Sequence, residues 1–167
     1  MTTTLSPNRT TCIAVSSPPG YSETFIRAHI ERLEQPVTVL TTRWKYTYHP
    51  SESLLPFPLW AGFKGVQYLR KRPDVVGQIN VGLAHLLEAA AYAHYFKHHK
   101  VGVVLAEYGL RGVDVLQGCI SASVPLVVHF HGFDAYQAQT LAEYAPAYRR
   151  MFEYATSIIA VSRDMEQ

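Results

Sequence analysis

The sequence predicts an α/β fold in which a mostly parallel sheet is flanked by helices, and three observations carry that prediction. Short apolar segments alternate with longer helical patterns along the 167 residues, as in chains built from strand–helix units. The run 101–106 is apolar throughout, which is typical of a strand buried on both faces. Two apolar strands, ending near residues 16 and 130, break into glycine-containing segments. Open α/β sheets bind their ligands at strand ends of this kind.

Periodicity, caps and prolines place the elements in order. Ser22 suits the N-cap of the first helix, with Glu23 in its first turn. Three prolines predict irregular structure over 43–58, and Pro73 separates two helical segments. The strands are expected at 11–16, 37–41, 101–106, 125–130 and 157–161. The later helices are expected at 59–72, 76–98, 112–122 and 137–155, with one more beginning at residue 163.

Composition is typical of one folded domain, with 48% hydrophobic and 17% charged residues. A net charge of +2 is too small to indicate nucleic-acid binding, and no nucleic-acid-binding motif is present. No apolar run approaches the ~20 residues that span a bilayer, and the N-terminus lacks the apolar stretch of a secretory signal. Cys12 and Cys119 lie in apolar segments, so we expect buried, reduced thiols of a cytoplasmic protein; a disulfide is the alternative.

Three segments, taken in order and spacing, resemble the N-terminal domain of GT-B fold glycosyltransferases of the retaining family 4 type, which build bacterial polysaccharides and glycolipids. They are the first helix, SETFIRAHIERL at 22–33, the strand and loop at 125–134 that ends in His-Gly-Phe-Asp, and the strand and serine turn at 158–165. The resemblance implies one Rossmann-like, acceptor-side domain over residues 1–167.

The donor-binding half of such enzymes carries a basic pair and a paired-glutamate motif, and these residues contain neither. The resemblance therefore implies a chain that needs a C-terminal domain and has little or no transfer activity alone. We expect the front part of a longer protein; one subunit of a split enzyme is the alternative.

The activity that the resemblance implies is transfer of a sugar, with retention, from a nucleotide-sugar to a saccharide or lipid-linked acceptor, without a metal or other cofactor. It implies that His131 lies beside the transferred sugar and bonds a hydroxyl, with its backbone carbonyl near the anomeric carbon, where positive charge develops. A capping or partly buried histidine is the alternative. His129 is interpreted as structural. A metal pair of His129 and His131 stays open, but no third ligand is identifiable.

The remaining candidates end strands or begin helices. The loop at Gly20 is expected to face phosphate or acceptor, since a helix N-terminus offers N–H groups to an anion; a plain turn is the alternative. Gly132 is expected to permit a sharp turn, and Asp134 to bind the acceptor or cap that turn. Glu107 is expected to bind a hydroxyl, act as a base, or pair with Arg111. The substrate- and donor-binding candidates are Gly20, Tyr21, Ser22, Glu107, Tyr108, Gly109, Gly132, Asp134 and Arg163.

The segment from Leu54 to Arg72 combines an aromatic-rich apolar stretch with a basic cluster. This pattern suits an anionic membrane surface, so we expect peripheral contact at the inner face of the membrane; core packing with a solvated basic face is the alternative. Two rival functions remain. One is a non-catalytic module that binds a saccharide or a partner protein. The other is a stand-alone nucleotide-binding domain, disfavoured because no Gly-x-Gly-x-x-Gly pattern follows the first strand.

Overall fold

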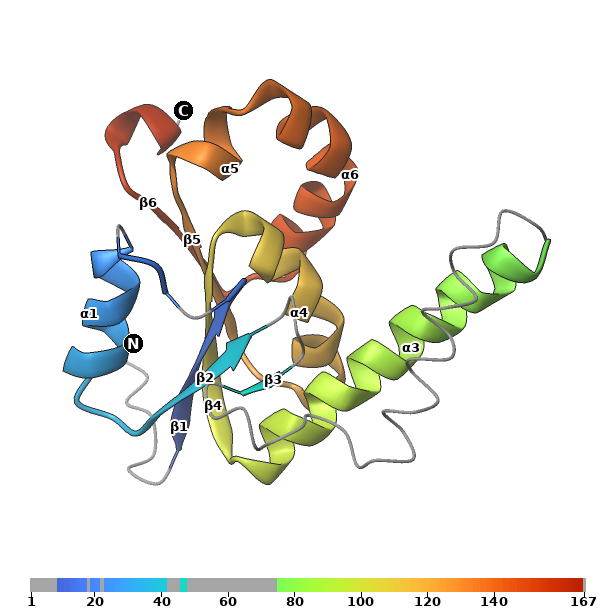
Figure 1. Cartoon of the computed structure of the whole chain (residues 1–167), viewed down its shortest axis with the longest axis horizontal. Helices are drawn as coiled ribbons and strands as arrows, with labels where there is room; N and C mark the ends of the chain where they lie inside the picture. Colours follow the sequence, from blue (N-terminus) through green and yellow to red (C-terminus); the bar gives the residue numbers. More distant parts are fainter. Residues whose placement is uncertain (1–8, 18, 22, 42–45, 48–74, 167) are drawn as a thin grey trace.

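The computed structural model describes residues 9–17, 19–21, 23–41, 46–47 and 75–166 as a sheet flanked by helices (Figure 1). The strands are β1 (Thr10–Val15), β2 (Val37–Thr41), β3 (Tyr46–Thr47), β4 (Val101–Glu107), β5 (Leu126–Phe130) and β6 (Ser157–Ala160). The helices are α1 (Thr24–Arg32), α3 (Val75–His98), α4 (Gly109–Ala122), α5 (Gly132–Tyr136), α6 (Ala138–Tyr154) and the 3₁₀ helix η1 (Arg163–Glu166).

The strands form one sheet in the order β3-β2-β1-β4-β5-β6. Five of them are parallel, and β3 pairs with β2 in the antiparallel sense. The predicted α/β, Rossmann-like class is therefore confirmed. The parallel arrangement brings the carboxyl ends of β1, β4 and β5 to one edge, which is where ligands bind in such sheets.

The two faces of the sheet are covered unequally, and β1 shows how. Cys12 and Ala14 point to the face covered by α3, α4 and α6, whereas Ile13 and Val15 pack with Ile26 of α1 on the other face. This alternation is the two-residue period of a strand. The α4 face carries the larger core, which includes Phe96, Val104, Val115, Leu126, Val128 and Met151.

The two cysteines confirm the prediction of buried, unpaired thiols. Cys12 and Cys119 are both buried and free. Burial raises the pKa of the Cys119 thiol to about 12, and that of Cys12 is also raised well above its usual value.

The differences from the prediction include two helix starts and one additional helix. Helix α1 begins at Thr24 with Glu23 at its N-cap position; the expected cap, Ser22, lies outside the described residues. Helix α4 begins at Gly109, three residues earlier than expected, because Tyr108 leaves the strand abruptly with φ 79°. Residues 132–136 form the separate short helix α5 ahead of α6, where only a loop was expected.

One further prediction differs from the structure, and two others fall on residues that the structure does not describe. Strand β3 occupies two residues of the segment 43–58 that was predicted to be irregular. The predicted helix 59–72 and the proposed membrane-contact segment, Leu54 to Arg72, lie outside the described residues. Among the residues that are described, no helix has both the length and the apolar character needed to cross a bilayer.

Candidate functional site

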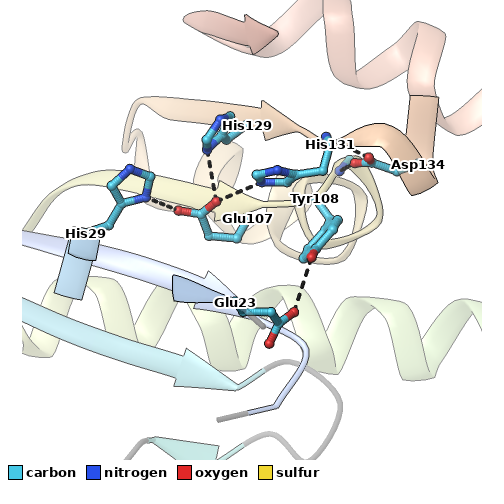
Figure 2. Close-up of polar contacts among 8 residues, drawn as sticks. Glu23, His29, Glu107, Tyr108, His129, His131 and Asp134 are labelled. Atoms are coloured by element: carbon cyan, nitrogen blue, oxygen red, sulfur yellow. Dashed lines mark hydrogen bonds and ion pairs between the residues drawn. The ribbon is translucent and has the colours of Figure 1, made fainter. Parts of the chain in front are cut away.

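Side chains from three elements meet at the carboxyl edge of the sheet. Glu107 is the last residue of β4, and the strand register sets it opposite His129 of β5. His131 follows the end of β5, and His29 reaches the same place from α1. In Figure 2 the three imidazole rings surround the Glu107 carboxylate. The cluster therefore joins residues that are up to 102 positions apart, from His29 to His131.

The Glu107 carboxylate is fully buried and has a histidine partner at both oxygens. Its Oε1 lies 2.5 Å from His29 Nδ1, while its Oε2 lies 3.1 Å from His129 Nδ1 and 3.2 Å from His131 Nε2. Burial raises the pKa of a carboxyl group, but hydrogen bonds from these rings outweigh it and hold the pKa of Glu107 below its usual value. The group is therefore charged at neutral pH, and a carboxylate of lowered pKa is a poor general base.

This arrangement decides between the expected partners of Glu107. The local pairing with Arg111 does not form: Arg111 instead makes an ion pair with Asp114, with Nη1 and Oδ2 2.9 Å apart. No side-chain surface of Glu107 is left exposed for a sugar hydroxyl. The contacts of Glu107 therefore orient the surrounding histidine rings.

His131 contacts two aromatic rings. Its ring centroid is 4.3 Å from that of Phe25 and 4.6 Å from that of Tyr108, and only 12% of the side chain is exposed. Burial lowers the pKa of His131, although Glu107 opposes the shift, so the ring is neutral at pH 7. The His131 carbonyl accepts a hydrogen bond from the Ala135 N–H at 3.2 Å, so it points into the first turn of α5. The ring, rather than the carbonyl, is the part of His131 that faces the cluster.

The Gly20 loop is tied to the same edge through Glu23. The Gly20 N–H donates to Glu23 Oε2 at 2.8 Å, and the Tyr108 hydroxyl donates to Glu23 Oε1 at 3.2 Å. Burial and the nearby Glu23 carboxylate raise the pKa of Tyr108 to about 12. The Gly20 amide, expected to be available to an anion, thus already binds a carboxylate of its own chain. Tyr21 beside it is exposed.

Of the two roles expected for Asp134, acceptor binding and helix capping, the structure shows the capping role. Its buried carboxylate accepts a hydrogen bond from the His131 N–H at 2.8 Å and another from the Gly109 N–H. It therefore joins the N-termini of α4 and α5. Burial raises the pKa of Asp134 more than these amide bonds lower it. None of the described glycines has a positive φ, and nothing lies within 4 Å of a Cβ added at Gly132, so the backbone there is also open to other residues.

Arg163 begins η1, which follows β6, two strands away from β4 in the sheet. It is exposed, and the structure does not bring it into the histidine cluster. A hydrogen bond of 3.3 Å from the Tyr136 hydroxyl to Asp164 links η1 to α5.

One member of the cluster was not recognised from sequence, and another was given a structural role with a metal pair to His131 as the alternative. His29 was missed because its partners are remote in the chain; the available signal was its position four residues after Phe25, on the same helix face. His129 was interpreted as structural. Among the described side chains, His29, Glu107 and His129 bring ligand atoms within 4.8 Å of one another, close enough to share a metal ion.

Comparison of this chain with protein-family models, with curated proteins and with solved structures found no match. The functional assignment therefore depends on the sequence and on the geometry of the carboxyl edge.

Proposed function

We propose that this chain is the N-terminal, acceptor-side domain of a retaining glycosyltransferase that moves a sugar from a nucleotide-sugar to a saccharide or lipid-linked acceptor. One observation carries the proposal. The two segments that the resemblance assigns to sugar handling, the Gly20 loop and His131, are more than 100 residues apart but meet at one edge through Glu23 and Tyr108. This edge is where an open α/β sheet binds its ligand.

In this proposal the neutral His131 ring hydrogen-bonds a hydroxyl of the transferred sugar, and Glu107 fixes its orientation. Preorganised polar groups of this kind stabilise developing charge without reorganising during the reaction. Phe133 and Tyr136 of α5 are exposed close to His131 in sequence and offer aromatic surface to a sugar ring. Helix dipoles and basic side chains of a second domain would stabilise the diphosphate leaving group, without a metal.

The partner that completes the site would be a donor-binding C-terminal domain. Exposed apolar side chains at the edge of the sheet support this part of the proposal: Ile158 and Ile159 lie in β6, the last strand of the sheet, and Val161 follows it. Contact of the segment 54–72 with an anionic membrane, as for a lipid-linked acceptor, remains a prediction from sequence.

The test joins the chain to the donor-binding half of a retaining GT-B enzyme and assays transfer from a panel of labelled nucleotide-sugars. We expect His131→Ala to lower transfer by about 10²-fold or more with little change in the melting temperature. His85→Ala, at an exposed position on α3, is the matched control and should leave transfer unchanged. Wild-type turnover in His131→Ala would remove His131 from the site.

A binding experiment on the chain alone separates this proposal from its rivals. Amide shifts at Gly20, Tyr108 and His131 on addition of acceptor saccharides are expected. Tight binding of a free nucleotide would instead favour a stand-alone nucleotide-binding domain.

A non-catalytic module for a saccharide or partner protein is the second candidate, favoured by the exposed apolar side chains of α5, α6 and β6. These are Phe133, Tyr136, Leu141, Phe152, Tyr154, Ile158 and Ile159. Saccharide or protein binding at these residues, without transfer by the joined protein and without loss in His131→Ala, would support this module.

A further inference from the structure

We propose that His29, Glu107 and His129 form a binding site for a zinc-class divalent ion. The inference does not depend on sugar transfer, whose proposed chemistry uses no metal. It starts from the convergence of two imidazole Nδ1 atoms on one buried carboxylate, with all three ligand atoms within 4.8 Å of one another.

The donor set selects the class of ion. Two of the three ligands are imidazole nitrogens, which suit zinc and its neighbours, whereas magnesium and calcium prefer sites made of oxygen atoms. A site with two histidines and one glutamate is also a known donor set of zinc. From sequence, His129 and His131 had no identifiable third ligand. The structure instead brings His29 and Glu107 to His129.

The distances leave little rearrangement to make. Zinc binds nitrogen and carboxylate oxygen at about 2.0–2.2 Å, so tetrahedral ligand atoms lie roughly 3.4 Å apart. The Glu107 oxygens are now 2.5 Å from His29 Nδ1 and 3.1 Å from His129 Nδ1. Small rotations of the side chains would admit the ion. A ring that binds the ion through Nδ1 would carry its proton on Nε2.

Burial and charge favour occupation. The Glu107 side chain is 0% exposed and charged, and a cation beside it would compensate that buried charge. His129 is 12% exposed and His29 is 33% exposed, so the opening of the site lies on the α1 side. A fourth ligand from solvent would enter there.

His131 would support the site without binding the ion. Its Nε2 lies 3.2 Å from Glu107 Oε2 and would hold the carboxylate in the orientation that binds the ion. Outer partners of this kind typically change metal affinity by 10–100-fold. Loss of His131 should therefore weaken the site, while loss of a ligand should weaken it further.

The test titrates the untagged full chain, first treated with EDTA and dialysed, with ZnCl₂ and CoCl₂. Because His94 and His98 stack one turn apart on the exposed face of α3 and offer a competing surface site, all proteins carry His94→Ala and His98→Ala. We expect one tight ion per chain by calorimetry, visible absorption typical of four-coordinate Co²⁺, and a raised melting temperature with zinc.

Single substitutions then assign the ligands. His29→Ala and Glu107→Gln should each weaken Zn²⁺ binding by more than about 100-fold, and His131→Ala by about 10-fold. Circular dichroism checks folding of each variant. Since His29 is partly exposed on α1, its variant keeps the test decisive if Glu107→Gln fails to fold. The proposal is overturned if the protein with His94→Ala and His98→Ala alone no longer binds zinc. It is also overturned if adding His29→Ala leaves zinc binding unchanged.

Discussion

Glu107 and Asp134 are two fully buried carboxylates at the same edge of the sheet, but different groups surround them. The partners of Glu107 are three histidine side chains, whereas those of Asp134 include two backbone amides. Side-chain partners rotate, change tautomer and accept a ligand. Backbone amides neither rotate nor change tautomer, and these two already donate to Asp134. Asp134 therefore belongs to the architecture and Glu107 to the candidate site.

The two pKa values support this distinction. Burial raises the pKa of both groups, but the three imidazole hydrogen bonds reverse the shift at Glu107 and the amide bonds do not reverse it at Asp134. A strongly polar side-chain shell therefore keeps Glu107 charged. Glu107, whose hydrogen-bond partners are side chains that can move, is therefore the better candidate for a functional residue than Asp134.

The largest effect is expected from Asp134→Asn. The amide has one accepting oxygen, so its NH₂ group would face a backbone N–H that cannot change its polarity. Leaving such buried groups unpaired should lower the free energy of unfolding by about 2–4 kcal/mol. Urea denaturation measures the loss. Asp164→Asn, at an exposed aspartate bonded only to the Tyr136 hydroxyl among described contacts, should stay within about 0.5 kcal/mol. Equal losses in both variants would contradict the capping role.

A smaller loss is expected from Gly109→Ala, at the helix start that Asp134 caps. A Cβ there would lie 2.5 Å from two ring atoms of Phe130 and 3.1 Å from the ring of Tyr148. Overpacking of this kind costs about 1–3 kcal/mol, which thermal or urea unfolding would detect. Gly132→Ala is the matched control at the start of α5, because nothing lies within 4 Å of its added Cβ. If Gly109→Ala were as stable as the control, close packing would not explain that glycine.

The fold was largely predictable because its signals are local. The apolar run 101–106 and the helical pattern of 76–98 each depend on neighbouring residues, and β4 and α3 lie within about one residue of them. The abrupt start of α4 was not predictable, since a positive φ at Tyr108 carries no composition signal.

The site was predictable only in part, because its contacts depend on register and packing. Glu107 and His131 were identified as strand-end residues. Arg111 is the nearest opposite charge to Glu107 in sequence, but it pairs with Asp114 instead. The strand register pairs Glu107 with His129, 22 residues away, and helix packing adds His29, 78 residues away.

The smallest effect distinguishes the two carboxylates most directly. Glu107→Gln, measured with EDTA present, should lower the free energy of unfolding by only about 1 kcal/mol, less than the amide substitution at Asp134. The glutamine NH₂ donates to an imidazole nitrogen that has changed tautomer, and removal of a buried charge offsets part of the loss. Glu143→Gln on the exposed surface of α6 is the control for charge removal alone. A loss at Glu107 as large as that of Asp134→Asn would mean that the histidines are as fixed as the backbone amides, and the cluster would then be architecture as well.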